Sequence, residues 1–290
     1  MRFGVAFPTT EIGTDPAVIR DFVQTVEGLG YDHLTCIDHV LGARRPLNEW
    51  RAYYTRDNMF HEVLVLFGFV AAVTSRIELA TAILILPQRQ TALVAKQAAE
   101  IDVLSRGRLR LGVGIGWNEI EFEALNENFR NRARRIEEQV QVLRGLWTQD
   151  LLTYKSGFHS ITDVGLNPVP VQRPIPIWLG AFEPPAVARA GRIADGWFVN
   201  PRIAPGNAAG DAVETFRSAA RSAGRDPARL GIDTTVHVGG KTPEQCAAEI
   251  EAWRAHGATH VTIRTMYAGL SSPRQHMDVL GRVRAALPKT

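Results

Sequence analysis

The segment IELATAILILPQRQTALVAKQAAEIDVLSRGRLRLGVGIG, residues 77–116, decides the fold. Residues 77–87 are almost continuously apolar, as expected of a strand that is buried on both faces. Residues 92–105 then predict a helix, and residues 108–116 predict a second strand. Two strands joined by a helix predict a βαβ unit, in which the strands are parallel.

Strand-like and helix-like segments alternate in the same way along the rest of the chain. Asp15 as an N-cap, Pro16 in the first turn and Gly30 at the end predict a helix over residues 15–30. Eight strands, each followed by a helix, predict an α/β fold of the (β/α)8 TIM-barrel type, with a doubly wound sheet as the alternative. The remaining strands are expected at residues 3–9, 33–39, 175–181, 196–200, 230–238 and 260–267, and the remaining helices at 62–74, 184–194, 206–223, 243–256 and 273–287, with a charged helical region that ends at Gln149.

Residues 151–174 form an irregular excursion before the strand at 175–181. Their prolines and glycines exclude a long helix and leave room for a short hairpin. No change in composition marks a boundary, so residues 1–290 are expected to form a single domain.

The composition is typical of a globular protein from a reducing compartment. Hydrophobic residues make up 45% of the chain and charged residues 22%, and the two cysteines are too far apart in sequence to suggest a disulfide framework. The N-terminus lacks the features of a signal peptide, and no apolar stretch is long enough to span a membrane. We therefore expect a cytoplasmic protein without a membrane partner.

The net charge of +3 is too small and too dispersed to predict nucleic-acid binding. Two basic runs, RGRLRLG at 106–112 and RNRARR at 130–135, are interpreted as solvated faces, with a phosphate or carboxylate contact as the alternative. The chain contains no HExxH, CxxC or GxSxG motif. No metal site is expected, although one assembled from scattered histidines and aspartates stays open.

Two ionisable residues, Asp38 and His39, end the strand expected at residues 33–39. In a TIM barrel the active site lies at the carboxyl ends of the strands, where an imidazole can exchange a proton near neutral pH. His39 is therefore a candidate catalytic residue, and a capping aspartate beside a structural histidine is the alternative. Because neighbouring side chains alternate along a strand, the chain is expected to leave the regular strand at Asp38 so that both side chains reach the mouth.

Small residues follow two other predicted strands. GVGIGWNE, residues 112–119, is not a dinucleotide fingerprint because Trp117 stands where a glycine is required, but its glycines would let a flat ligand or a neighbouring strand approach closely. Gly180 and Ala181 precede a helix with Pro184 near its start, and the free N–H groups there predict an anion site. An ordinary βα turn is the alternative.

Carboxylates at the same ends leave glycoside hydrolysis open as another kind of chemistry. Glu119 or Glu121 could pair with Glu183 as the two carboxylates of such a site. The sequence alone does not give the distance between them.

Several longer segments together resemble the luciferase-like monooxygenase superfamily, the bacterial-luciferase type of TIM barrel. Within it, the chain is similar to the actinobacterial branch that uses the deazaflavin coenzyme F420. Residues 1 to about 200 share sequence motifs with this superfamily. The last third of the chain resembles it in the order of its strands and helices more than in motif. The segments that carry it are GYDHLTCIDHVLG (30–42), LATAILILPQRQTALVAKQAAEIDVLSRGRLRLGVGIGW (79–117), RRIEEQVQVLRGLW (134–147), NPVPVQRPIPIWLGA (167–181) and ADGW (194–197).

The resemblance implies a role for each candidate residue. His39 should lie beside the carbon that exchanges the hydride, and Asp38 should lie against the cofactor ring. Ala82 and Ile83 should carry a bulge with a non-proline cis peptide that backs the ring. Gly114, Ile115 and Asn118 should border the ring and its side chain, and Gly180 and Ala181 should bind the phosphate.

One position departs from a branch of this superfamily. Sugar-phosphate dehydrogenases carry an acidic glutamate where this chain has Trp117, whose indole cannot transfer that proton. The departure argues against sugar-phosphate oxidation and leaves His39 as the main proton-handling residue. A planar or apolar substrate is expected from an aromatic mouth formed by Trp50, Tyr53, Tyr54, Phe60, Trp117 and Trp197.

The resemblance implies an oxidoreductase that transfers a hydride between F420 and a small organic substrate. An FMN-dependent luciferase-like monooxygenase is the nearest alternative, and a non-catalytic flavin-binding protein is an alternative from another class. The expected partner is a small molecule, and a homodimer stays open.

Overall fold

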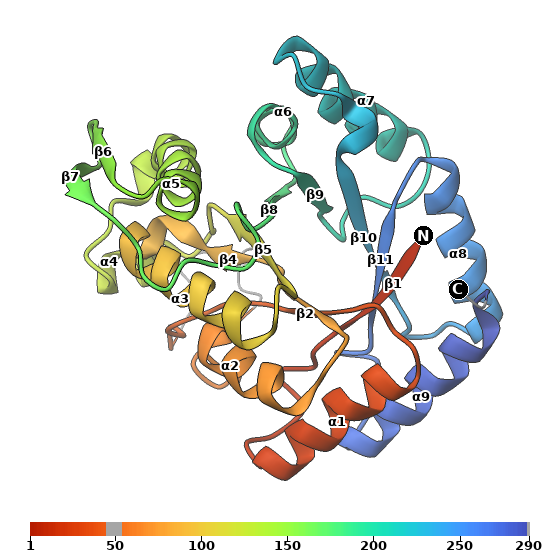
Figure 1. Ribbon diagram of the computed structural model, residues 1–290. Coiled ribbons are helices and arrows are strands. Elements are labelled where there is room, and N and C mark those ends of the chain that lie inside the picture. Colours follow the sequence, from red (N-terminus) through yellow and green to blue (C-terminus); the bar gives the residue numbers. More distant parts are fainter. Residues whose placement is uncertain (45–53, 289–290) are drawn as a thin grey trace.

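The structure is a computed structural model that describes residues 1–44 and 54–288, and it confirms the TIM barrel. In the described part of the chain, parallel strands close into a ring, because β1 pairs with both β2 and β11 while β3 pairs with β5 (Figure 1). A doubly wound sheet would stay open. The strands of the barrel are β1 (Arg2–Ala6), β2 (His33–Cys36), β3 (Glu78–Thr81), β4 (Leu84–Ile85), β5 (Leu109–Gly114), β8 (Ile177–Ala181), β9 (Gly196–Val199), β10 (Gly231–His237) and β11 (His260–Arg264).

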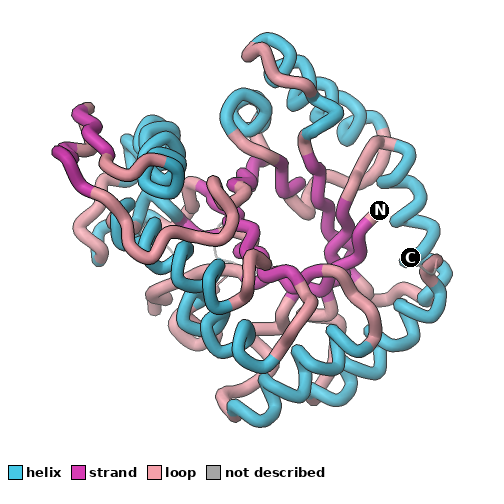
Figure 2. The backbone as a smooth tube through the Cα atoms, in the orientation of Figure 1, coloured by secondary structure: helices cyan, strands magenta, loops and turns pink. Residues whose placement is uncertain are grey.

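The helices surround this ring and cover its outer face (Figure 2). Capping residues mark the starts of two of them: the side chain of Asp15, the predicted N-cap, accepts a hydrogen bond from the N–H of Ala17 (2.8 Å), and Thr242 and Gln245 form a capping box. The long helices are α1 (Pro16–Gly28), α2 (Val63–Val73), α3 (Thr91–Leu104), α5 (Arg132–Thr148), α6 (Pro184–Ile193), α7 (Asn207–Ser222), α8 (Pro243–Ala255) and α9 (Pro273–Ala286), and the short α4 covers Glu119–Ala124. Among the described residues, no helix is long and apolar enough to cross a bilayer.

The third strand is interrupted, which corrects the continuous strand expected at 77–87. β3 ends at Thr81, and a short β4 begins only at Leu84. Between them, Ala82 and Ile83 are joined by a non-proline cis peptide bond, which confirms the distortion expected at this place. The N–H of Ala82 donates to the carbonyl of Cys36 (2.7 Å), so the interruption lies directly beside the end of β2.

The excursion before β8 contains the short hairpin for which the sequence left room. Strands β6 (Leu152–Lys155) and β7 (Ser160–Val164) pair antiparallel outside the barrel, beside α5 (Figure 1). His159 in the hairpin turn lies 2.7 Å from the hydroxyl of Thr91, the first residue of α3. This contact ties the hairpin to the helical layer.

The lower part of the barrel holds a buried charged cluster, which corrects the solvated interpretation of the run at 106–112. The Nε of Arg110 donates to Glu78 Oε1 (2.6 Å), and its Nη1 donates to Asp233 Oδ2 (3.1 Å). The guanidinium also lies 4.3 Å from the centre of the Trp178 ring. The interpretation is wrong at Arg110 because side chains of a closed barrel point either to the lumen or to the helices, and neither side is solvent.

The second basic run, residues 130–135, is solvated only in part. Arg130, just before α5, and Arg134, in its first turn, are exposed. Arg135 is half-buried and forms an ion pair with Glu127 on the connection that precedes the helix.

Candidate functional site

The end of β2 brings Asp38 and His39 to the carboxyl end of the barrel. The strand ends at Cys36, so the predicted departure from the regular strand at Asp38 is confirmed. Both side chains are buried, with exposed fractions of 3% and 9% for Asp38 and His39. They point to different partners, however, and this separates their roles.

Asp38 holds the segment that follows the interruption of the third strand. Its Oδ2 accepts a hydrogen bond from the N–H of Ile85 (3.0 Å), and its Oδ1 accepts one from Nη2 of Arg89 (2.8 Å). Arg89 in turn donates to Glu62 at the start of α2 (2.9 Å). Burial raises the pKa of Asp38, while Arg89 and the N–H of Ile85 oppose this effect. Both carboxylate oxygens of Asp38 therefore bind the segment that follows β3, which fixes its backbone.

His39 is paired with a carboxylate that sequence reasoning did not connect to it. Its Nδ1 lies 3.1 Å from Oε2 of Glu121, a fully buried residue of α4. The other carboxylate oxygen accepts hydrogen bonds from the N–H groups of Val40 (2.5 Å) and Leu41 (3.1 Å). Although burial alone would raise it, the pKa of Glu121 is lowered by His39 and by these two N–H groups.

This pairing fixes the chemistry available to the imidazole. An ionised carboxylate only accepts hydrogen bonds, so Nδ1 of His39 must carry the proton of its bond to Glu121. In the neutral ring, Nε2 is then the basic nitrogen. Among the described residues no hydrogen bond to Nε2 is present, and this atom is left to exchange a proton with a ligand.

Aromatic rings surround His39, as expected for part of the mouth. The ring centres of Tyr54, Phe60 and Trp117 lie 5.3, 4.9 and 5.6 Å from that of the imidazole. Such a shell limits the access of water to the imidazole. Two other residues expected at the mouth, Trp50 and Tyr53, lie outside the described residues.

Trp197 does not belong to the mouth, which corrects its assignment there. Its side chain is fully buried between β9 and the helices, where it packs against Phe216 of α7. Its indole N–H donates to the carbonyl of Ala181 (3.1 Å). Alternation along β9 explains the error, because the neighbouring Phe198 points into the lumen near Arg110 and Trp197 must point outward.

Three of the predicted cofactor-binding residues meet in the upper part of the barrel. A Cβ atom at Gly114 would lie only 2.6 Å from Cδ1 of Ile83, and one at Gly180 would lie 2.8 Å from its Cγ2. The two glycines therefore leave the space that the isoleucine occupies. Ile83 and its neighbour Ala82 are only half-buried, so they form an apolar ledge against which a flat ring can lie.

The other predicted cofactor-binding residues lie around this ledge. Ile115 is half-buried after β5, and Asn118 is the N-cap residue of α4 without using its side chain as the cap. Ala181 is buried at the end of β8 and precedes the first turn of α6. Its side chain belongs to the hydrophobic core, so a ligand could use only its backbone.

The carboxylates do not form the pair needed for glycoside hydrolysis. Glu121 is committed to His39 and to two backbone N–H groups. Glu119 and Glu183 are exposed at the starts of α4 and α6. Neither of these exposed side chains lies in the apolar, enclosed surroundings in which the acid of such a pair works.

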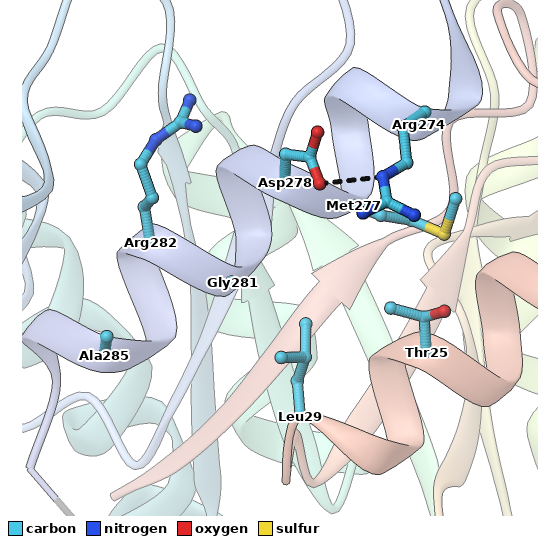
Figure 3. Close-up of a pocket in the computed structure, with 8 residues that line it drawn as sticks. All are labelled: Thr25, Leu29, Arg274, Met277, Asp278, Gly281, Arg282 and Ala285. Carbon is cyan, nitrogen blue, oxygen red and sulfur yellow. Dashed lines mark hydrogen bonds and ion pairs between the residues drawn. The ribbon is translucent and has the colours of Figure 1, made fainter.

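A surface pocket between α1 and α9 lies apart from these residues (Figure 3). Its volume is about 550 Å³, and the figure shows Arg274 hydrogen-bonded to Asp278 on its rim, with Nε and Oδ1 3.0 Å apart. None of the predicted site residues lines it. The lining residues are Thr25, Leu29, Arg274, Met277, Asp278, Gly281, Arg282 and Ala285.

The amino-acid sequence is similar to those of several known proteins. Residues 1–287 match the model of a family described as luciferase-like monooxygenase. An uncharacterised protein of Mycobacterium tuberculosis is 35% identical over 207 residues, which are 68% of each chain. An FMNH2-dependent dimethylsulfone monooxygenase of Pseudomonas putida is 34% identical over 189 residues, which are 64% of this chain and 51% of that protein.

Solved structures share the whole fold. A monooxygenase from Streptomyces bottropensis has a TM-score of 0.83 at 18% identity and covers 99% of this chain and 98% of its own. An F420-dependent secondary alcohol dehydrogenase, solved with an F420–acetone adduct, has a TM-score of 0.81 at 18% identity and covers 99% of both chains. At such identities the likeness concerns the fold alone.

Proposed function

Because the chain belongs to the luciferase-like monooxygenase family, we propose that it is an F420-dependent oxidoreductase that transfers a hydride between this deazaflavin and a small organic substrate. The observation that carries the proposal is the ledge of Ile83 over Gly114 and Gly180. A flavin-type ring is flat and largely apolar, so the residues present fit it. When bound, such a ring supplies the hydride chemistry.

The residues of this chain would hold the ring and handle one proton. Ile83 would support one face of the ring, and the backbone around Gly180 and Ala181 would bind the cofactor phosphate at the first turn of α6. Nε2 of His39 would give or take the proton that accompanies hydride transfer, a role worth roughly 10²–10⁴ in rate. Glu121 would keep the imidazole in the required tautomer and orientation.

The choice of F420 over FMN rests on two sequence patterns, IDHVLG at 37–42 and LPQRQT at 86–91. In the fold these two segments meet, because Asp38 in the first contacts Arg89 in the second. This contact means that both patterns help to hold the backbone that follows Ile83 in the ledge.

A second candidate, an FMN-dependent monooxygenase, is favoured by the identity to the dimethylsulfone monooxygenase. The two candidates differ in their use of oxygen, because reduced deazaflavin reacts poorly with it. A third candidate, a flavin-binding protein without catalysis, would bind cofactor and turn nothing over. The pairing of His39 with Glu121 argues against it, since binding alone needs no oriented imidazole.

Equilibrium dialysis against an equimolar mixture of F420 and FMN tests the proposal. We expect the protein to retain F420 in preference to FMN, as measured by the absorbance of the retained fraction. Preferential retention of FMN, together with oxygen consumption in the presence of reduced FMN and substrate, would assign the protein to the monooxygenases. Retention of neither cofactor would reject both.

A further inference from the structure

Arg264 is a further charged residue at the mouth of the barrel. It is the last residue of β11, and side chains alternate along this strand. Val261 and Ile263 belong to the hydrophobic core, whereas Thr262 points into the lumen, where its hydroxyl donates to Asp233 (3.0 Å). Arg264 shares the orientation of Thr262 and lies one layer higher, so it projects into the lumen at the carboxyl end of the barrel.

The guanidinium of Arg264 has weak partners for a residue in this position. Its Nη2 donates to the hydroxyl of Tyr54 at 3.5 Å, and its centre lies 5.5 Å from the ring of Tyr267. Its Nε is buried and has no hydrogen-bond partner. Within residues 1–44 and 54–288, no carboxylate lies within 4.0 Å of it. Arg89 and Arg110, in contrast, each contact two carboxylates.

An uncompensated guanidinium inside a protein is unfavourable, because part of its hydration is lost without a replacement. Folded proteins tolerate such groups mainly where a ligand completes them. The planar fork of arginine matches the two oxygens of a carboxylate or of a similar oxyanion. Tyr54 adds a second donor, because its hydroxyl accepts from Arg264 and can donate its own proton to the same ligand.

The position of Arg264 relative to the proton-handling residue points to the substrate. Tyr54 contacts both residues, since its ring lies 5.3 Å from that of His39 and its hydroxyl contacts Arg264. β11 is separated from β8, where the cofactor phosphate is expected, by β9 and β10. A ligand held by Arg264 would therefore reach toward His39 from a part of the barrel rim that is separate from the expected phosphate site.

We propose that Arg264 and Tyr54 bind an oxyanion, such as a carboxylate, on the organic substrate, so that the protein acts on anionic rather than neutral molecules. This inference rests on the proposed function for the location of the reaction, but the anion site itself does not require F420. The cofactor also carries anionic groups and is the other source of such an oxyanion. The experiment separates the two sources.

Calorimetric titration with benzoate and its neutral isostere benzamide, in the absence of cofactor, tests the anion site. We expect the wild type to bind benzoate roughly tenfold to a hundredfold more tightly than benzamide, as a charge-assisted hydrogen bond implies. Acetate and acetamide provide a smaller pair that fits the mouth if the aromatic probes do not. Arg264→Gln should abolish the preference for the anion in each pair.

Arg202→Gln is the matched control, because Arg202 is an exposed arginine just after β9, another strand of the same barrel, and lies over the ring of Phe182. This variant should keep the preference of the wild type. Equal binding of anion and amide by the wild type in both pairs would overturn the proposal. A preference that survives Arg264→Gln would overturn it as well, because the anion would then lie elsewhere.

Two further measurements complete the test. F420 affinity should change less than twofold in Arg264→Gln, and a large loss would assign the anion to the cofactor and overturn the assignment to the substrate. The melting temperature of ligand-free Arg264→Gln should be at least that of the wild type, and a drop of several degrees would make Arg264 a structural residue. Failure of F420 to bind would reject the proposed function yet leave the preference for benzoate intact.

Discussion

Nδ1 of His39 and Oε2 of Glu121 lie 3.1 Å apart and join the end of β2 to the start of α4. The carboxylate also accepts from the two N–H groups that follow His39, so it fixes both the ring and its backbone. This arrangement resembles the orienting carboxylate of other histidine-based sites, which stabilises the charged imidazole and selects its tautomer. We therefore expect Glu121 to act as a positioning residue and His39 to touch the ligand.

Glu121→Gln should change the tautomer of His39. A glutamine offers one acceptor oxygen where the carboxylate accepts three hydrogen bonds, so the bond to Nδ1 weakens. Nitrogen-15 chemical shifts of the His39 ring should show protonated Nδ1 in the neutral wild type and a mixture of tautomers in the variant. Turnover number should fall roughly 10–100-fold with little change in KM, by analogy with other orienting partners of histidine. Glu119→Gln, on the exposed side of the same helix, should leave the shifts unchanged. Glu121→Gln shifts that equal those of the wild type would refute the orienting role.

His39→Ala should retain cofactor binding and lose most turnover. The expected loss is roughly 10²–10⁴-fold, because a positioned general acid or base contributes about that much. Steady-state turnover and cofactor titration of the same preparation measure the two effects separately. His256→Ala, at the C-cap of α8 and away from the mouth, serves as the control. Undiminished turnover by His39→Ala would make the imidazole a structural residue.

Gly114→Ala should weaken cofactor binding by displacing the ledge. The added Cβ would meet Ile83 at 2.6 Å, which is closer than Cβ atoms approach other heavy atoms. Ile83→Ala in the same chain should remove the collision and restore the fold around position 114, although it also removes the ledge. The two changes should therefore be non-additive in cofactor affinity and in melting temperature. Gly157→Ala, where a Cβ meets nothing within 4 Å, is the control; additive effects would show that Ile83 does not occupy the space left by Gly114.

The buried cluster under the site predicts a loss of stability in acid. Although burial alone would raise it, the pKa of Asp233 is lowered well below its usual range by His33 and Arg110, and burial with Arg110 lowers the pKa of His260 to about 2. Both groups bind protons more readily in the unfolded chain, so the free energy of unfolding decreases as the pH is lowered. The contribution of His260 is lost below about pH 6.5, and that of Asp233 is lost below about pH 3.9.

Urea unfolding midpoints at several pH values check this expectation. His260→Gln should flatten the decline between about pH 6.5 and pH 4. Asp233→Asn should lower the free energy of unfolding at pH 7 by ~3–5 kcal/mol, because it removes one partner of a buried ion pair with Arg110. A decline in acid that is as steep in His260→Gln as in the wild type would place its origin elsewhere.

The sequence predicts the barrel well because each element carries a local signal. Caps at Asp15 and Thr242 and apolar strands of the correct length are short-range features, and the structure has helices and strands where they indicate. Arg110 and Trp197 were assigned wrongly because alternation along a strand does not say which side is the lumen. Which face of a strand points to the lumen is decided only when the strands close into a ring.

The candidate site was only partly predictable for a related reason. Asp38, His39 and the small residues of the ledge follow strands, so the rule for barrel mouths finds them. Glu121 is 82 residues from His39, and nothing local to either residue indicates that they meet. Arg264 falls inside the strand expected at residues 260–267, but its lack of a counter-ion in the described part of the chain is a property of the fold.

The most direct test of the account is the proton chemical shift of the Ile83 δ1 methyl group. It is measured in a proton–carbon-13 correlation spectrum of isoleucine-labelled protein with and without F420. A ring resting on the ledge would shift the methyl proton signal strongly upfield, because these protons would lie over the face of an aromatic system. The signal of Ile250, a fully buried residue of α8, should stay in place. We predict an upfield shift of Ile83 that saturates with F420; saturable binding of F420 without any shift of the Ile83 methyl would contradict the placement of the cofactor and with it the proposed site.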